Sequence, residues 1–200
     1  GSLYDSYVSS DKHGGGYIAW EKIKPDFIYD PSMSYFELVV PTKDTVRFSY
    51  ILNTQIKVQK PVFITGNTGV GKTVIVSDTL YYMKENENSF PVFLTFSAQT
   101  SSIQTQNSIL SKLDSKRKDM VGGPGGKKVV LMIDDVNMPA VEVYGAQPPI
   151  ELLRQYCDLN YIYDRGQHFP IQIIDTTLVC CAAPPEGGRN PLTPRFTRHF

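Results

Sequence analysis

Apolar residues follow two alternating patterns along the chain. Uninterrupted apolar runs, which are typical of strands covered on both faces of a sheet, predict strands at 62–64, 91–96, 129–133 and 178–183. Apolar residues at helical spacing predict helices at 42–58, 72–83, 97–113 and 149–158. Because strands alternate with helices, we expect an α/β fold with a mostly parallel sheet flanked by helices.

The predicted helix at 42–58 has an expected buried side, which consists of Val46, Tyr50, Ile51, Leu52 and Ile56. The stretch 97–113 is polar, but apolar residues recur in it at helical intervals: Ile103, Ile109, Leu110 and Leu113. A short apolar run, 36–41, ends at a proline before the first of these helices. The last residues, His199 and Phe200, look like the start of a further strand, so we expect the chain to be a piece of something longer.

The remaining stretches are interpreted from their turn-forming residues. Residues 1–36 are rich in aromatic and turn-forming residues, and we expect an N-terminal extension that packs on the core. Aromatic residues there would also suit base stacking, but no basic surplus is present to hold a phosphate backbone. The glycine-rich stretch 116–128 is predicted to be a flexible loop with solvated basic residues, and 159–174 a hairpin or long loop.

Composition narrows the class of protein. The 200 residues are 41% hydrophobic and 20% charged, which is typical of one globular domain with a proper core. Twenty basic and twenty acidic residues cancel, so nothing favours wholesale binding to nucleic acid or to an anionic membrane. We find no apolar stretch of membrane-spanning length and no signal-peptide pattern. Three cysteines without metal-ligand spacing indicate a reducing compartment: Cys157, Cys180 and Cys181.

The clearest chemical signal follows the first apolar run, where Gly66 to Thr73 match the pattern G-x-x-x-x-G-K-T. Its glycines permit backbone torsions that let successive N–H groups surround a phosphate, and the helix start directs its positive dipole end at the same anion. Lys72 would reach the β- and γ-phosphates, and the Thr73 hydroxyl would bind magnesium. The alternative is a chance match, but a strand before the loop and a helix after it favour phosphate binding. The expected nucleotide-binding residues of this stretch are Gly66, Asn67, Thr68, Gly69, Val70, Gly71, Lys72, Thr73 and Val74.

A pair of acids follows the five-residue apolar run at 129–133. A phosphate site needs a magnesium ion, and Asp134 is placed to bind it at the end of a core strand. Many ATPases have a glutamate at the next position, which polarises the attacking water. Here the residue is Asp135, whose reach is shorter by roughly 1.5 Å. The alternative is that both acids cap the segment that follows.

The end of the chain supplies three arginines, Arg189, Arg195 and Arg198. An arginine can stabilise the charge of phosphoryl transfer on a neighbouring subunit, but it can equally be a surface residue. No guanine-specifying Asn-Lys-x-Asp motif follows the glycine-rich loop, which favours ATP over GTP.

Five stretches together resemble the dynein heavy chain: 39–47, 66–73, 133–139, 144–155 and 184–200. The resemblance is to the third AAA+ module of the motor ring in an axonemal, or ciliary, isoform, and it covers nearly the whole chain. It implies a P-loop NTPase of AAA+ type, with 1–36 as an extension on the core and 37–200 as the large α/β subdomain. The helical lid subdomain is missing from this stretch.

The resemblance also implies a role and a set of partners. It implies a regulatory module that binds ATP or ADP with Mg²⁺ in a six-module ring. The whole motor would move toward microtubule minus ends in the axoneme of the cilium, within the cytoskeleton. The implied partners are the neighbouring AAA+ modules of the same heavy chain, microtubules, and dynein intermediate and light chains, with no nucleic acid and no membrane.

Site roles carry over by position. Val39, Val40 and Pro41 would line the adenine pocket, 66–73 would be Walker A, and Asp134 with Asp135 would be Walker B. Arg195 best matches the arginine finger, which acts in trans on the nucleotide of the preceding module, and Arg198 is the second candidate. The catalytic residues implied are therefore Asp135, Lys72 and Arg195.

Two positions depart from the family pattern. Asp135 replaces the usual glutamate, and Ala182 stands where a sensor asparagine is expected at the end of the fourth strand. Both weaken the positioning of water, so we expect slow or no hydrolysis by this chain alone. A structural ring segment with an empty or inert nucleotide site is the alternative. A free-standing ATPase is disfavoured because the lid is missing.

Overall fold

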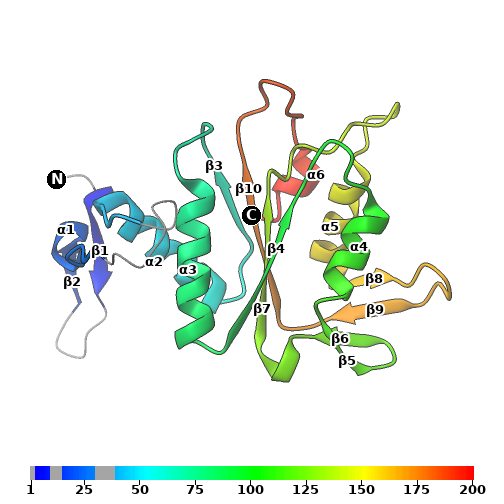
Figure 1. Ribbon diagram of the computed structural model, residues 1–200, viewed down its shortest axis with the longest axis horizontal. Helices are drawn as coiled ribbons and strands as arrows, with labels where there is room; N and C mark the ends of the chain where they lie inside the picture. The colour runs from blue at the N-terminus through cyan, green and yellow to red at the C-terminus, as the bar shows by residue number, and fades with distance from the viewer. Residues whose placement is uncertain (1–2, 10–14, 30–38) are drawn as a thin grey trace.

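A four-stranded parallel sheet forms the centre of the computed structural model, which describes residues 3–9, 15–29 and 39–200 (Figure 1). Its strand order is β3-β10-β7-β4, formed by Val62–Thr65, Thr176–Ala182, Lys128–Asp134 and Ser89–Thr95. All three neighbouring pairs are parallel. The predicted α/β fold with a parallel sheet is therefore confirmed, and each of the four predicted strands is present.

Helices cover both faces of this sheet, which explains the uninterrupted apolar runs. On one face, alternate residues of β7 and β10 such as Val130 and Cys181 pack against α2 (Lys43–Lys57) and α3 (Lys72–Asn86). On the other face, residues such as Leu131 and Leu178 pack against α4 (Ser102–Leu110) and α5 (Pro148–Leu159). Figure 1 shows the two pairs of helices on opposite sides of the sheet.

Helix α2 begins as predicted, but its buried side was only partly predicted. Thr42 caps the helix, because its side chain accepts a hydrogen bond from the Thr45 N–H while its own N–H donates to Thr45 Oγ1. Leu52 and Ile56 are buried, as expected. The prediction was wrong for Tyr50 and for Ile51, which is 44% exposed. Tyr50 faces the N-terminal segment rather than the sheet.

Helix α4 is shorter than predicted because a polar turn precedes it. The Ser97 N–H donates to Thr100 Oγ1 at 2.8 Å, and Ser101 then caps the helix through the Gln104 N–H. Of the apolar residues at helical spacing, Ile109 is buried, whereas Ile103 is 52% exposed.

A second sheet lies beside α4 and α5, in the order β5-β6-β9-β8. Its strands are Asp114–Arg117, Met120–Gly122, Pro170–Ile173 and Tyr161–Tyr163. The prediction of a flexible loop at 116–128 was wrong, because β6 pairs with both β5 and β9 and the short helix η3 (Pro124–Gly126) follows. The hairpin interpretation of 159–174 is confirmed by the antiparallel pair β8–β9.

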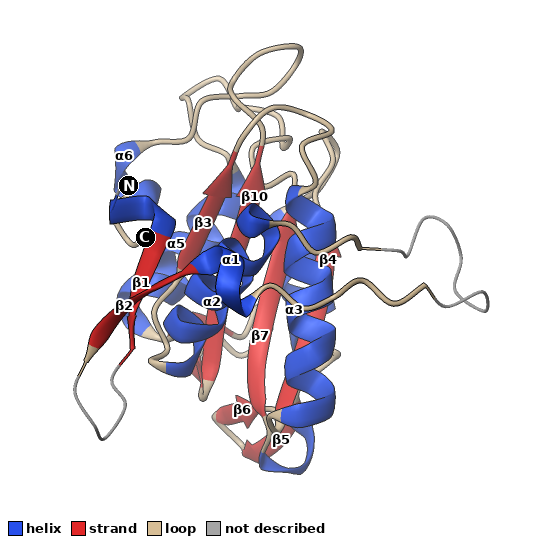
Figure 2. Cartoon of the chain, turned by 90° about the vertical axis from the view of Figure 1, so that its left-hand side faces the viewer, coloured by secondary structure: helices blue, strands red, loops and turns tan. Residues whose placement is uncertain are grey.

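The N-terminal segment packs on α2. It consists of η1 (Leu3–Asp5), the antiparallel hairpin of β1 (Ser6–Ser9) and β2 (Gly16–Ala19), and α1 (Trp20–Ile23). Figure 2 views the molecule from this side. Trp20 is buried and its ring lies 4.9 Å from that of Tyr7 and 5.2 Å from that of Tyr50. Residues 36–38 of the apolar run 36–41 lie outside the described residues.

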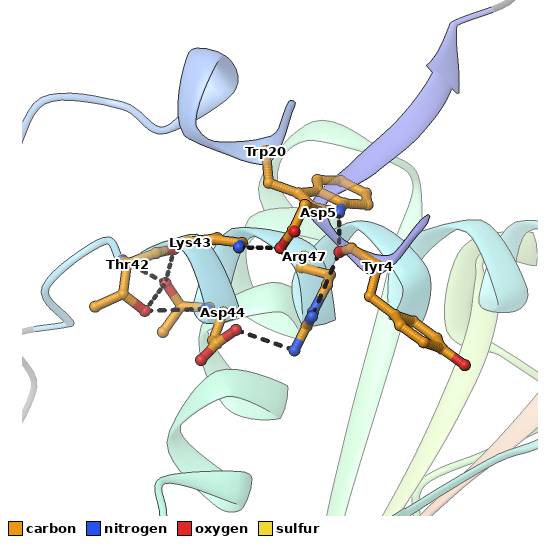
Figure 3. A network of polar contacts seen from close by, with 8 residues as sticks. Tyr4, Asp5, Trp20, Thr42, Lys43, Asp44 and Arg47 are labelled. Atoms are coloured by element: carbon orange, nitrogen blue, oxygen red, sulfur yellow. Dashed lines mark hydrogen bonds and ion pairs between the residues drawn. The ribbon is translucent and has the colours of Figure 1, made fainter. Parts of the chain in front are cut away.

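Polar contacts complete this junction (Figure 3). The Trp20 indole N–H donates to the Tyr4 carbonyl at 3.0 Å, and Arg47 donates to the same oxygen at 3.4 Å. Lys43 and Asp5 form an ion pair. The start of α2 is thus joined to the N-terminal segment by both aromatic and charged contacts.

The last described residues form the short helix α6 (Pro194–Thr197) and a turn, not the predicted start of a strand. Phe196 is fully buried in the core on the α5 side of the sheet. Across the described ranges, no helix combines the length and apolarity needed to cross a bilayer.

Candidate functional site

The candidate site lies at the carboxyl edge of the parallel sheet, where ligands of open α/β sheets bind. β10 separates β3, which leads into the glycine-rich loop, from β7, which ends at Asp134. The loops after β3 and β10 lie together at the upper edge in Figure 1. Residues that are far apart in the sequence therefore meet at this edge.

The glycine-rich loop has the open form that a phosphate requires. Gly69 and Gly71 have φ angles of +83° and +84°, and a Cβ atom at either position would meet no other atom within 4 Å. Gly71 directly precedes α3, a helix of 15 residues. The Lys72 ammonium group donates to the carbonyl oxygens of Gly66 and Asn67, each at 2.8 Å. The lysine thus lies across its own loop.

The two predicted magnesium ligands are in direct contact. The Thr73 hydroxyl donates to Oδ2 of Asp134 at 2.7 Å, although the two residues are 61 positions apart. The other carboxylate oxygen of Asp134 accepts the Asp135 N–H at 3.0 Å. Hydroxyl and carboxylate oxygens are donors that Mg²⁺ prefers, so this pair fits the ion. Within the described ranges, no cluster of three or more His, Cys, Asp or Glu side chains is arranged to hold a metal ion.

Asp135 lies beside this pair and faces an arginine. Its backbone is left-handed, with a φ of 51°, a conformation that aspartate tolerates better than most residues. Its Oδ1 lies 3.5 Å from Nη2 of Arg189. The alternative that the two aspartates cap a helix is wrong, because the next helix, α5, begins only at Pro148.

The segment after β7 is fastened to the segment after β10. The Val136 N–H donates to the Cys181 carbonyl at 3.0 Å, and the Asn137 amide donates to the Ala183 carbonyl at 2.8 Å. Ala182, at the predicted sensor position, is buried and pairs with Thr65 in the sheet. Sequence reasoning gave no role to Asn137 and none specifically to Arg189. Nothing in their local sequence signals contacts that come from 46 and 54 residues away.

A buried thiol lies near the charged groups. The pKa of Cys181 is raised to about 12, mainly by burial and also by the negative charge of Asp134, while the positive charge of Lys72 opposes the rise. The thiol is fully buried in β10. It therefore belongs to the packing beneath the site and is unsuited to act as a nucleophile.

The predicted adenine-pocket residues border an open cavity of about 990 Å³. Val39 and Pro41 line it together with Ile75 and Asp78 of α3, whereas Val40 is 55% exposed and does not. Burial raises the pKa of the Asp78 carboxyl group in this wall. None of the residues 66–73 lines the cavity, which begins just beyond them along α3.

The two candidate arginines of the C-terminal segment differ in their contacts. Arg198 donates to Oδ1 of Asp158 at 2.8 Å, and Arg154 holds the other oxygen of this carboxylate at 2.7 Å. Arg195 is exposed, and its side chain makes no hydrogen bond or ion pair within the described ranges. Of the two, Arg195 is thus the one available to another molecule.

Comparison with known proteins places this geometry in a family. The family model of the P-loop-containing dynein motor region matches residues 27–200. The chain is 51% identical over 90% of its length to human dynein axonemal heavy chain 6. Over its whole length it is 45% identical to mouse dynein axonemal heavy chain 12 and 46% identical to mouse heavy chain 3.

The matched stretch is a small part of these relatives, about 4 to 6% of their length. The family match nevertheless covers the glycine-rich loop, the two acids and the C-terminal arginines in one fold. This chain therefore belongs to the P-loop-containing dynein motor region family, as an AAA domain of the axonemal heavy-chain type.

Proposed function

We propose that this chain is a regulatory module that binds Mg²⁺ with ATP or ADP in an axonemal dynein motor, as the third AAA+ module of its ring. One observation carries the proposal: the Thr73 hydroxyl and the Asp134 carboxylate meet at 2.7 Å beside an open glycine loop. Oxygen donors from these two elements are the set that holds magnesium in P-loop ATPases.

The residues of the site have separate roles in this proposal. The N–H groups of 66–71 and the N-terminus of α3 would surround the phosphates, and Lys72, which now contacts loop carbonyl oxygens, would bind phosphate oxygens instead. Thr73 and Asp134 would hold magnesium, and Val74 follows Thr73 on α3. Val39 and Pro41, with Val40 between them, lie on the side of the base. The bound nucleotide supplies a transferable phosphoryl group.

Slow turnover follows from two side chains. Asp135 is the candidate to polarise the attacking water, but its carboxylate is one methylene shorter than that of glutamate. Ala182, at the end of β10, has no polar side-chain atom to assist it. Because binding and hydrolysis use different groups, the module can hold nucleotide while it hydrolyses slowly or not at all.

The proposal includes partners that lie outside this chain. The exposed Arg195, which has no polar partner among the described residues, supports a role in trans on the nucleotide of the preceding module. The packing of residues 3–9 and 15–29 on α2 supports a division into an N-terminal extension, 1–36, and a large subdomain, 37–200. In the whole motor the module would act with its neighbouring modules, microtubules, and intermediate and light chains in the cytoskeleton of the cilium.

A purely structural ring segment is the second candidate function. The contacts of Lys72 with the Gly66 and Asn67 carbonyls favour it, because they satisfy the ammonium group without a phosphate. In this case the loop is a stable turn, and replacement of Lys72 would leave the affinity for nucleotide unchanged.

Thermal melting separates the two functions. With Mg·ADP or Mg·ATP at a hundredfold excess over the dissociation constant, stability should rise by about 2.7 kcal/mol, or about 5 to 11 °C for a domain of this size. Lys72→Ala should abolish the shift. Lys84→Ala, an exposed lysine near the other end of α3, is the matched control and should retain it.

Two results would contradict the proposal. A melting shift that persists in Lys72→Ala would mean that nucleotide binds elsewhere, and no shift in the unchanged chain would favour the structural segment. The expectation of slow hydrolysis is separate. Turnover at ordinary enzyme rates, about 1 to 1000 per second, would refute it while leaving binding intact.

A further inference from the structure

Arg189 reaches the candidate site from the loop that follows β10. Its Nη2 lies 3.5 Å from Oδ1 of Asp135, and the two side chains are only 22% and 38% exposed. Within residues 39–200, no other side chain pairs with Asp135. The Nε atom of Arg189 is buried and has no hydrogen-bond partner in the described part of the chain. One nitrogen of the guanidinium thus contacts the acid, while another N–H donor remains without an acceptor.

The backbone of Arg189 is held in place relative to Asp135. The next residue, Asn190, donates its N–H to the Asn137 carbonyl at 3.0 Å and its amide to the Pro139 carbonyl at 2.9 Å. The Arg189 N–H itself donates to the Glu186 carbonyl at 3.3 Å. The loop after β10 is therefore fixed to the segment that follows the two acids. A partly buried arginine whose loop is held in this way is suited to orient the neighbouring carboxylate.

Two features of the site indicate that Asp135 needs a further polar side chain to orient it. The carboxylate of Asp135 is shorter than that of glutamate, and the strand that should provide a sensor side chain ends in Ala182. Arg189 is the polar residue that the loop after this strand delivers to the acid. Its guanidinium offers several N–H donors in a rigid fork, so it can contact the acid and a second oxygen at the same time.

We propose that Arg189 is a positioning residue that orients Asp135 and, through its unpartnered Nε–H donor, makes this orientation depend on the γ-phosphate of a bound nucleotide. The proposal rests on the proposed function, because it requires nucleotide at the glycine loop. It adds that the γ-phosphate is recognised from within the chain, by the loop after β10, in addition to any arginine from a neighbouring module.

The first test compares affinities by calorimetry. Mg·ADP and the non-hydrolysable Mg·AMP-PNP are titrated into the unchanged chain and into Arg189→Ala, Arg189→Lys and Arg117→Ala. Arg117 is an exposed arginine of β5, at the opposite end of the molecule in Figure 1, and it serves as the control. Arg189→Ala should weaken Mg·AMP-PNP about 10-fold or more, as expected for the loss of a hydrogen bond to a charged group, and change Mg·ADP less than about twofold.

Lysine keeps the charge but loses the fork, so Arg189→Lys should fall between the unchanged chain and alanine. The second test is a double-mutant cycle on the single-turnover hydrolysis of Mg·ATP. Arg189→Ala should slow this step about 10-fold. Combined with Asp135→Asn it should be no slower than Asp135→Asn alone, because both changes remove the same arrangement.

Two results would overturn the proposal: an Mg·AMP-PNP to Mg·ADP affinity ratio that Arg189→Ala leaves unchanged, or additive losses in the cycle. Melting curves exclude simple misfolding, and the lysine variant retains the test if alanine unfolds the chain. A chain that binds neither nucleotide would refute the proposed function as well. A chain that binds both nucleotides, with an affinity ratio that does not change when Arg189 is replaced, would refute only the role of Arg189.

Discussion

Replacement of Phe196 with alanine should destabilise the whole chain, even though it lies in a helix of only four residues close to the C-terminal end. Its side chain is fully buried in the core on the α5 side of the sheet. Its ring meets that of Phe200 edge-on at a centroid distance of 5.2 Å, and Phe200 in turn meets Phe63 of β3 at 5.4 Å. The short helix α6 is thus joined to the strand that leads into the glycine loop.

The magnitude follows from this burial. Removal of a buried phenylalanine side chain costs about 3 to 5 kcal/mol, of which the aromatic pair supplies about 0.5 to 1.5 kcal/mol. At about 2 to 4 °C per kcal/mol for a domain of this size, the melting temperature should fall by about 6 to 20 °C. Phe48→Ala is the matched control. That ring is 45% exposed, and its recorded partner is the Arg47 guanidinium at 4.9 Å, so the loss should be below about 1 kcal/mol.

Urea unfolding followed by circular dichroism measures both variants. For Phe196→Ala the urea concentration at the midpoint should fall, while the slope of the unfolding free energy against urea concentration should change little, because the substitution acts on the native core. If the two variants lose the same free energy, within about 1 kcal/mol, α6 is not part of the cooperative core. In that case the inference that α6 is joined to β3 through Phe196 and Phe200 is refuted.

Two further predictions concern a thiol and a glycine. Because burial raises the pKa of Cys181 to about 12 from an ordinary value near 9, the unfolded thiol ionises first, so stability should fall between pH 9 and 12 by about 1.4 kcal/mol per pH unit for this group. Urea titrations at pH 8, 9 and 10 measure the fall, and an equal slope in Cys181→Ala would contradict its cause. Gly123→Ala should destabilise the chain by more than about 1 kcal/mol, because its Cβ would lie 2.1 Å from the Lys127 carbonyl oxygen, whereas Gly16→Ala meets nothing within 4 Å. The two variants are compared by their melting temperatures. Equal values would show that the turn around Gly123 can shift to accommodate a Cβ atom without loss of stability.

The local sequence pattern was sufficient to predict the parallel sheet and the glycine-rich loop. The strand at 129–133 was predictable because a strand covered on both faces must be apolar at every position, and the loop because its glycines and lysine have fixed spacing. The cap at Thr42 was likewise predictable, since its partner, Thr45, lies three residues away. In each case the physical cause lies within a few residues of the feature.

The errors have the opposite character, because their causes lie far away in the sequence. β6 is a strand because it pairs with β9, about 50 residues later, and its glycines alone indicated a loop. Tyr50 was assigned to the sheet side of α2, but Trp20 and Tyr7 of the N-terminal segment receive its ring. The contact between Asp135 and Arg189 also depends on the assembled sheet. Such pairs require tertiary structure.

The position of β10 has a consequence for how the chain is made. It is the last strand of the parallel sheet in sequence order, yet it lies between β3 and β7 and pairs with both. A ribosome that has released residues 1–175 has therefore produced both halves of the phosphate site without the strand that holds them together. Closure of this long-range sheet must wait for residues 176–182, and until then the backbone edges of β3 and β7 that pair with β10 lack their hydrogen-bond partners.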